Sequence, residues 1–245
     1  MGSLTISEAL ITNATGGGVN VSTSGALNVT LDSVTTAGGT NGVNLVGTTG
    51  TFTANGGSLQ NASGAAFSIS GGTSNVTYAG TMTEDVGVLV AVANTTGGTK
   101  TFSGAITDGN DGDGSGITLT TNTGATINFS GGLTLSTGAN AAFTATGGGT
   151  VNVTQNNTTI VNTLATTTGT ALNVANTTIG ASGLTFRSIS SNGGSSPGIV
   201  LNTTGASGGL TVTGDGSNIT RGGNSSGGTM GNKDDLDTTP DGLGN

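Results

Sequence analysis

The sequence predicts an all-β fold, a right-handed parallel β-helix (β-solenoid) of about eight coils with three short strands in each coil. One apolar-polar-apolar triplet recurs eight times with a mean spacing of about 26 residues, a period typical of solenoids. Gly supplies 49 of the 245 residues, far above the ordinary share of about 7%, as a chain with many tight corners requires. No segment shows the i, i+3, i+4 apolar spacing of a helix. The chain is therefore predicted to be ordered β structure throughout its repeats.

The first strand of each coil is the clearest element, because its apolar residues alternate with polar ones as in a half-buried strand. Its eight copies are Val19-Asn20-Val21, Val43-Asn44-Leu45, Phe67-Ser68-Ile69, Val88-Leu89-Val90, Ile117-Thr118-Leu119, Phe143-Thr144-Ala145, Leu172-Asn173-Val174 and Ile199-Val200-Leu201. The outer members of each triplet are expected to face the inside of a tube and the middle member to face water.

The second strand follows after a short Gly/Asn/Thr/Ser break in every coil. Its copies are Leu27-Asn28-Val29, Phe52-Thr53-Ala54, Val76-Thr77-Tyr78, Thr101-Phe102-Ser103, Ile127-Asn128-Phe129, Val151-Asn152-Val153, Leu184-Thr185-Phe186 and Leu210-Thr211-Val212. A shorter third strand is expected around Val34, Leu59, Met82, Ile106, Leu133, Ile160, Ile189 and Ile219. A β-sandwich or barrel would also give short strands at this spacing, but it has no reason to repeat every third strand.

The repeat is already running at residue 4, since Leu4-Thr5-Ile6 lies 23 residues before Leu27-Asn28-Val29. Residues 1–228 are therefore expected to form a single β-solenoid that begins in the middle of a coil. Residues 229–245 hold a cluster of acids and are expected to form an acidic C-terminal tail or a partial coil.

Charge limits the partners. The chain has twelve acidic residues and only four basic ones, Lys100, Arg187, Arg221 and Lys233, which gives a net charge of −8. So few cations cannot neutralise a run of phosphates, so no nucleic-acid partner is expected. No stretch approaches 18 continuous apolar residues, so no membrane-spanning helix is expected, and no secretory signal is visible at the first residues.

Several segments, among them Ile127-Asn128-Phe129-Ser130-Gly131-Gly132-Leu133 and Ala141-Ala142-Phe143-Thr144-Ala145, resemble large bacterial surface proteins of the β-strand-repeat, right-handed parallel β-helix type. The resemblance covers most of residues 4–228. It implies an extracellular location at the bacterial cell surface, as for autotransporter passengers and adhesins. It brings no catalytic residues.

One acidic corner is a candidate metal site. Its possible ligands are Asp108, Asn110, Asp111 and Asp113, spaced by glycines so that several oxygens could surround Ca²⁺. The spacing does not fit an EF-hand, because the alternation breaks at Gly112. Calcium, bound weakly, is thus the one cofactor that the sequence suggests. The alternative is that these residues form a solvated acidic corner without a metal.

The outward positions of the first two strands decide the expected function. None of these sixteen is ionisable: Asn20, Asn44, Ser68, Leu89, Thr118, Thr144, Asn173, Val200, Asn28, Thr53, Thr77, Ser103, Asn128, Asn152, Thr185 and Thr211. The chain also lacks His and Cys, so general-base and nucleophile options are few. No enzymatic activity is expected.

The leading expectation is a structural segment of a bacterial cell-surface or secreted protein, an adhesin stalk or a filament-forming β-helix. Its partners would be further copies of itself, through end-to-end strand association, or a host or surface glycan or protein. Two alternatives remain: a carbohydrate-active β-helix enzyme and an ice-binding solenoid face. Threonines such as Thr51 and Thr53 favour the ice-binding face, whereas Asn at equivalent places interrupts the threonine array.

Overall fold

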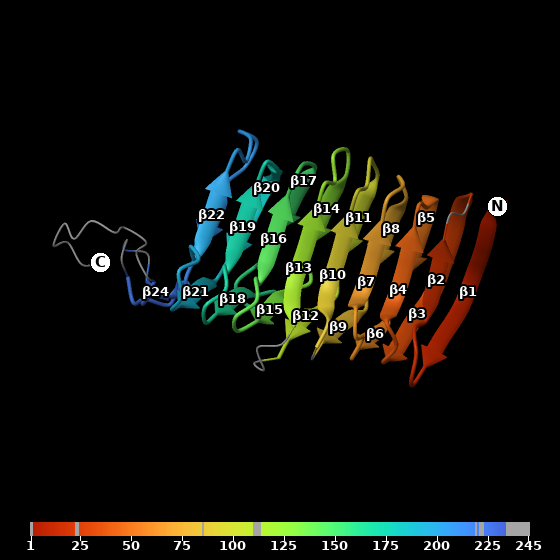
Figure 1. Ribbon diagram of the computed structural model, residues 1–245, viewed down its shortest axis with the longest axis horizontal. Helices are drawn as coiled ribbons and strands as arrows, with labels where there is room; N and C mark the ends of the chain where they lie inside the picture. The colour runs from red at the N-terminus through yellow and green to blue at the C-terminus, as the bar shows by residue number, and fades with distance from the viewer. Residues whose placement is uncertain are drawn as a thin grey trace.

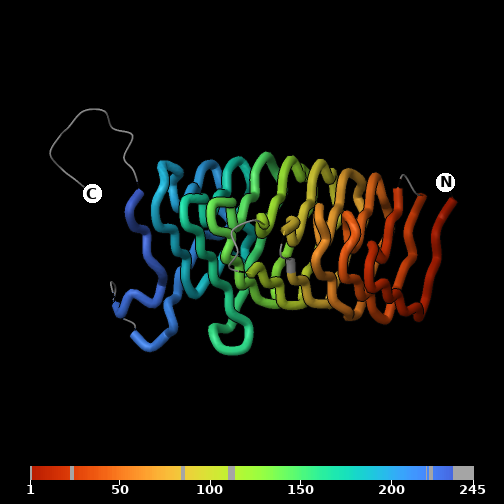
Figure 2. The backbone as a smooth tube through the Cα atoms, turned by 60° about the horizontal axis from the view of Figure 1, so that its bottom comes forward, coloured from red at the N-terminus to blue at the C-terminus, as the bar shows by residue number. Residues whose placement is uncertain are grey.

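The computed structural model is a parallel β-solenoid of about eight coils, and it describes residues 2–22, 25–84, 86–109, 114–218, 220 and 223–233. Its strands stack side by side along the longest axis, with β1 at one end and β24 toward the other (Figure 1). Figure 2 shows the same chain as a tube wound in successive coils. The described residues contain no helix. The predicted all-β solenoid is confirmed.

The first strands of the coils form a ladder of eight parallel strands, here called the first ladder. It consists of β2 (Val19–Ser22), β4 (Asn41–Val46), β7 (Ala65–Ser70), β10 (Val88–Ala93), β13 (Ser115–Thr120), β16 (Phe143–Thr146), β19 (Leu172–Ala175) and β22 (Ile199–Asn202).

The remaining strands form one 16-stranded sheet that covers the other two sides of the tube. The second ladder contains β5 (Thr49–Ala54), β8 (Asn75–Tyr78), β11 (Thr99–Phe102), β14 (Thr126–Phe129), β17 (Thr150–Val153), β20 (Thr178–Phe186) and β23 (Leu210–Val212). The third ladder contains β6 (Gly57–Gln60), β9 (Thr81–Glu84), β12 (Ile106–Asp108), β15 (Leu133–Ser136), β18 (Asn162–Thr166), β21 (Ser188–Asn192) and β24 (Met230–Gly231).

Two long strands join these ladders at the N-terminal end. The first half of β3 (Ala26–Ala37) pairs with β5 and its second half pairs with β6. Strand β1 (Leu4–Asn13) pairs with β3, and Leu4 lies opposite Leu27. The predicted register of the first residues is therefore confirmed. At the other end β24 extends the third ladder, with Met230 opposite Ser191. Residues 234–245 lie outside the described residues, so the nature of 229–245 stays a prediction.

The fourth coil corrects two sequence predictions. Val90 lies opposite Phe67, so the outward residue of β10 is Ala91. Leu89 was expected to face water but is fully buried. The cause is the position of Leu89 at the start of the strand: the predicted triplet began two residues early, and Leu89 lies level with the buried Ala66, between Val88 opposite Ala65 and Val90 opposite Phe67.

The second correction concerns the next strand of that coil. Thr101 lies opposite Thr77 and Asn128, so Thr101 takes the matching outward position in the ladder. Ser103 follows the end of β11 and is exposed, as predicted. Lys100 consequently occupies an inward position, aligned with Val76 on one side.

The predicted third-strand position at Ile160 is also wrong. Asn162 pairs with Leu133, and Leu164 fills the apolar position further along the strand. Ile160 lies in the preceding loop and is only partly buried. Ile219 lies outside the described residues.

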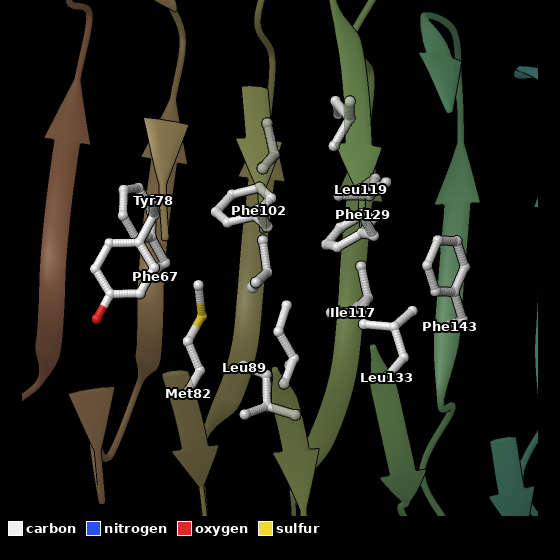
Figure 3. Close-up of a cluster of buried hydrophobic side chains, with 14 of the residues drawn as sticks. Phe67, Tyr78, Met82, Leu89, Phe102, Ile117, Leu119, Phe129, Leu133 and Phe143 are labelled. Carbon is white, nitrogen blue, oxygen red and sulfur yellow. The ribbon is translucent and has the colours of Figure 1, made fainter. Parts of the chain in front are cut away.

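The interior contains every aromatic side chain of the protein, six Phe and one Tyr. Phe67 contacts Tyr78 and Phe102, with ring centroids 5.4 Å apart in both pairs. Phe102 stacks on Phe129 at 5.3 Å, and Phe129 meets Phe143 edge-on at 5.7 Å (Figure 3). Each fully buried side chain of this size contributes about 1.5–3 kcal/mol before entropy losses. This aromatic column ties successive coils together.

Gly is required where one corner passes closely over the next. Gly57 has φ +107°, and a Cβ there would lie 2.0 Å from the carbonyl oxygen of Val34. A Cβ on Gly104 would lie 1.8 Å from the carbonyl oxygen of Gly80. Any larger residue would push adjacent coils apart, which explains the high Gly content.

Candidate functional site

The predicted calcium corner is described in part. Asp108 ends β12, where its alternation with buried Ile106 turns its side chain toward the interior, and it is 3% exposed. Gly114 leaves room for it, because a Cβ there would lie 3.3 Å from Asp108 Oδ1. Asn110, Asp111 and Asp113 lie outside the described residues. Across the described ranges no group of three or more His, Cys, Asp or Glu side chains is placed to hold a metal. Calcium binding here stays a prediction.

Lys100 is the chemically distinctive residue that sequence reasoning missed. It stacks between Val76 and Ile127 inside the second ladder and is fully buried. Its Nζ donates a hydrogen bond to the carbonyl oxygen of Gly97 at the adjoining corner. Desolvation inside the tube lowers the pKa of Lys100 to about 8. The signal for this placement was the alternation Thr99-Lys100-Thr101-Phe102, in which the threonines face outward.

Complete burial decides what Lys100 can do. A ligand in solution does not reach an amine inside a closed tube, so this ammonium is not a surface site for anions. Its hydrogen bond instead satisfies the carbonyl oxygen of Gly97 at the adjoining corner.

Among the loops between strands whose residues are all described, the longest is residues 154–161, which connects β17 to β18 and projects from the tube as the green loop in Figure 2. Its shape comes from Asn156, whose Oδ1 accepts backbone hydrogen bonds from Thr158, Thr159 and Ile160 at 3.0, 3.0 and 2.8 Å. This is the local side-chain-to-backbone bonding that favours Asn in turns.

Arg187 fastens this loop to the following coil. Its Nε donates to Asn157 Oδ1 at 2.7 Å and its guanidinium NH₂ donates to the Asn157 carbonyl at 2.6 Å. Asn157 Nδ2 then donates to the carbonyl oxygen of Gly214 at 2.9 Å, one coil further along. The guanidinium is therefore committed to internal acceptors, which suits a clamp better than an anion site.

Asp215 organises a second polar cluster near this loop. Its Oδ1 accepts from the side-chain hydroxyl of Ser217 at 2.7 Å and from the backbone N–H of Ser217 at 2.9 Å. Asn224 Nδ2 lies 3.4 and 3.3 Å from its two oxygens. These hydrogen bonds, led by the Ser217 hydroxyl, lower the pKa of Asp215 to about 2. Such a stabilised anion is a poor proton acceptor at neutral pH.

The outward face of the second ladder is regular in its composition. Across six successive levels each strand presents two outward residues, and all twelve are Thr or Asn. We call these twelve the threonine–asparagine face: Asn28, Thr30, Thr51, Thr53, Asn75, Thr77, Thr99, Thr101, Thr126, Asn128, Thr150 and Asn152. None of them is buried. The sequence prediction assigned only one outward residue to each strand, so it did not reveal that the outward residues form two columns.

The first ladder offers a contrast of the same size. Its outward positions mix Asn, Ser and Thr with apolar residues such as Val46, Ala91 and Ala93. The uniform Thr and Asn composition of the second ladder is therefore not shared by the first ladder, although both belong to the same solenoid.

Comparisons with protein-family models, with curated proteins and with solved structures give no match for this chain. Within the described ranges, no helix is long and apolar enough to cross a membrane.

Proposed function

We propose that this chain is a rigid, non-enzymatic structural segment of a bacterial cell-surface or secreted protein, an adhesin stalk or part of a filament. The observation that carries the proposal is the unbroken eight-strand first ladder, packed on a continuous aromatic column. Each coil contacts its neighbours over three strands, so bending the tube would break backbone hydrogen bonds and aromatic contacts together.

The composition of the outward faces supports a role without catalysis. The outward residues of the first ladder and all twelve residues of the threonine–asparagine face are described, and none is ionisable. Glycoside hydrolysis needs paired carboxylates that flank the substrate, and the polar cluster around Asp215 holds one carboxylate with a lowered pKa.

An extracellular location is part of the proposal, and antibody labelling tests it. Antibodies raised against the purified chain should label intact cells of the source bacterium, or the protein should be found in the culture medium. Labelling that requires permeabilised cells would contradict the surface proposal. Incubation with pectate, alginate and other acidic polysaccharides should release no shortened products, and any cleavage would contradict the structural role.

The last described coil supports end-to-end association with a second copy. Ile199, Leu201, Val212 and Met230 are 36%, 45%, 40% and 43% exposed, although they continue inward columns of the tube. Val212, for example, lies over the buried Phe186. Ile199, Val212 and Met230 border a groove of about 910 Å³. At the opposite end Leu4 and Ile6 of β1 lie opposite Leu27 and Val29 of β3 and are only partly buried.

Light scattering across a hundredfold range of concentration tests this contact. The chain should associate weakly and increasingly with concentration, because the exposed apolar area is small. The change Val212→Lys should abolish association, whereas Leu10→Lys, which replaces an exposed residue on the outer side of β1, should leave it intact. A chain that stays monomeric at every concentration would contradict the end-to-end contact.

A further inference from the structure

The threonine–asparagine face combines uniform chemistry with a fixed lattice. From β3 to β17 the strands pair without a register shift, so the twelve residues form two straight columns over six levels. Neighbours within a column are about 4.8 Å apart, and the two columns are about 6.6 Å apart, twice the rise of a strand residue.

The side chains of this grid have little freedom. Thr is β-branched, so its χ1 angle is restricted on a strand. Asn152 Nδ2 donates to Asn128 Oδ1 at 2.9 Å, and the backbone N–H of Thr99 donates to Asn75 Oδ1 at 2.8 Å. Behind the grid lies the close-packed aromatic column, which includes Phe102 and Phe129. Polar atoms and methyl groups are therefore held at repeating positions before any ligand arrives.

From these observations we infer that the threonine–asparagine face binds the surface of ice. Each Thr hydroxyl has one donor and two acceptor sites, so every level of the grid can hold water molecules at fixed points. The grid repeats about every 4.8 Å along a column and about every 6.6 Å between columns, so it presents its hydroxyl groups with the two-dimensional periodicity that a crystal face also has. Water that the grid orders in solution then needs little further ordering when it joins the crystal.

The same face is a poor fit for a soluble glycan or protein. Small ligands are usually held in concave sites by apolar and aromatic side chains with a few converging polar groups. Here the surface is the outer side of a strand ladder, and all seven aromatic residues of the chain point into the tube. The face also carries no charge that would attract an ionic partner.

This inference does not depend on the proposed structural role, since a surface stalk and a secreted monomer could both present the face. It is tested by the growth of ice crystals in a frozen sucrose solution that contains the full chain. Wild-type protein should slow recrystallisation and produce a gap between the melting and freezing temperatures of a single crystal.

Two matched variants locate the activity. Thr77→Lys places a long charged side chain in the middle of the grid, and Thr144→Lys makes the same change on the outward side of the first ladder. Thr77→Lys should raise about tenfold the protein concentration that is needed to slow ice recrystallisation. A tenfold change corresponds to about 1.4 kcal/mol of binding free energy. Thr144→Lys should leave that concentration unchanged. Both variants should melt within a few degrees of the wild type, and Thr77→Ala replaces Thr77→Lys if that variant unfolds.

Three results would overturn the inference. One is a wild-type chain that leaves ice growth unaltered. Another is an equal loss of activity in Thr77→Lys and Thr144→Lys, which would remove the effect from this face. The third is binding of a soluble polysaccharide that Thr77→Lys abolishes, because the face would then serve a glycan.

Discussion

The central coils and the C-terminal coils belong to the same tube but differ in the regularity of their strand pairing and in the length of their corners. Between β3 and β17 the second ladder keeps one register, and its inward residues are almost all buried. Beyond β17 the chain carries the loop 154–161, a register shift in β20 between the partners of Val151 and Val153, and the long segment 213–229. Apolar residues such as Leu201 become exposed there.

The difference shows which positions the fold requires. Inward columns must stay apolar and aligned, since every coil packs on the next through them. Corners accept insertions, because a longer loop leaves the paired strands in place. Regular outward grids therefore occur where corners are short, and irregular polar clusters such as the one around Asp215 occur where corners are long.

The largest predicted effect comes from placing a charge in an inward column of the central coils. Ile127 is 2% exposed, so Ile127→Asp should lower the free energy of unfolding by about 3–5 kcal/mol, because an unpaired carboxylate would be buried. Asn128→Asp, on the neighbouring outward position, should cost less than about 1 kcal/mol. Denaturant unfolding measures both. Equal losses of stability in the two variants would mean that the inward and outward residues of this strand are exchanged.

A smaller change in the free energy of unfolding should follow from replacing Lys100, the lysine buried inside the central coils. Lys100→Met keeps the length of the side chain and removes the buried ammonium group, so stability at pH 7 should rise by about 1–3 kcal/mol. The buried lysine has a pKa of about 8, and the unfolded chain has the ordinary value of 10.5. Between these values the unfolded state binds more protons, so wild-type stability should increase as the pH rises from 8.

The Lys100→Met variant serves as the control for that pH dependence, because the rise between pH 8 and about 10 should be absent from it. Above pH 10 the buried Tyr78, whose pKa burial raises, should lower the stability of both proteins. A wild-type stability that is flat from pH 8 to 10 would contradict the buried placement of Lys100.

The smallest effect should come from the clamp on the irregular side of the molecule. Arg187→Ala removes two hydrogen bonds to Asn157, and it should lower global stability by about 1–2 kcal/mol. Backbone amides of Thr158 and Ile160 should exchange hydrogen faster, while those of Phe129 and Val151 should not change. Faster hydrogen exchange at all amides along the tube would show that the loop does not open independently of the coils.

Much of this architecture was predictable from residue patterns. The inward columns of the first ladder and the register of Leu4 against Leu27 follow from strict alternation of apolar and polar residues. The errors occurred where alternation is ambiguous. Val88, Leu89, Val90 and Val92 offer two registers two residues apart, and burial of neighbouring coils selects between them.

The functional face was harder to predict than the fold. Lys100 occupies an inward position that a polar residue rarely takes, so the outward partners Thr99 and Thr101 were not recognised as a pair. Asn28 and Thr53 were compared as equivalent positions, although they belong to different columns of the grid. Only the pairing of the strands assigns each side chain to its column.

The central claim is one tube in which each coil stacks in register on the last, and engineered disulfides test it most directly. The chain has no cysteine, so a pair can be introduced without interference. Paired residues in neighbouring strands have Cα atoms about 4.8 Å apart, within the range of about 4.4–6.8 Å that disulfides span. Under mild oxidation Thr77→Cys with Thr101→Cys should form a disulfide within one chain, as a mobility shift on non-reducing gels. Thr77→Cys with Ser103→Cys should remain reduced, and preferential cross-linking of that second pair would contradict the account.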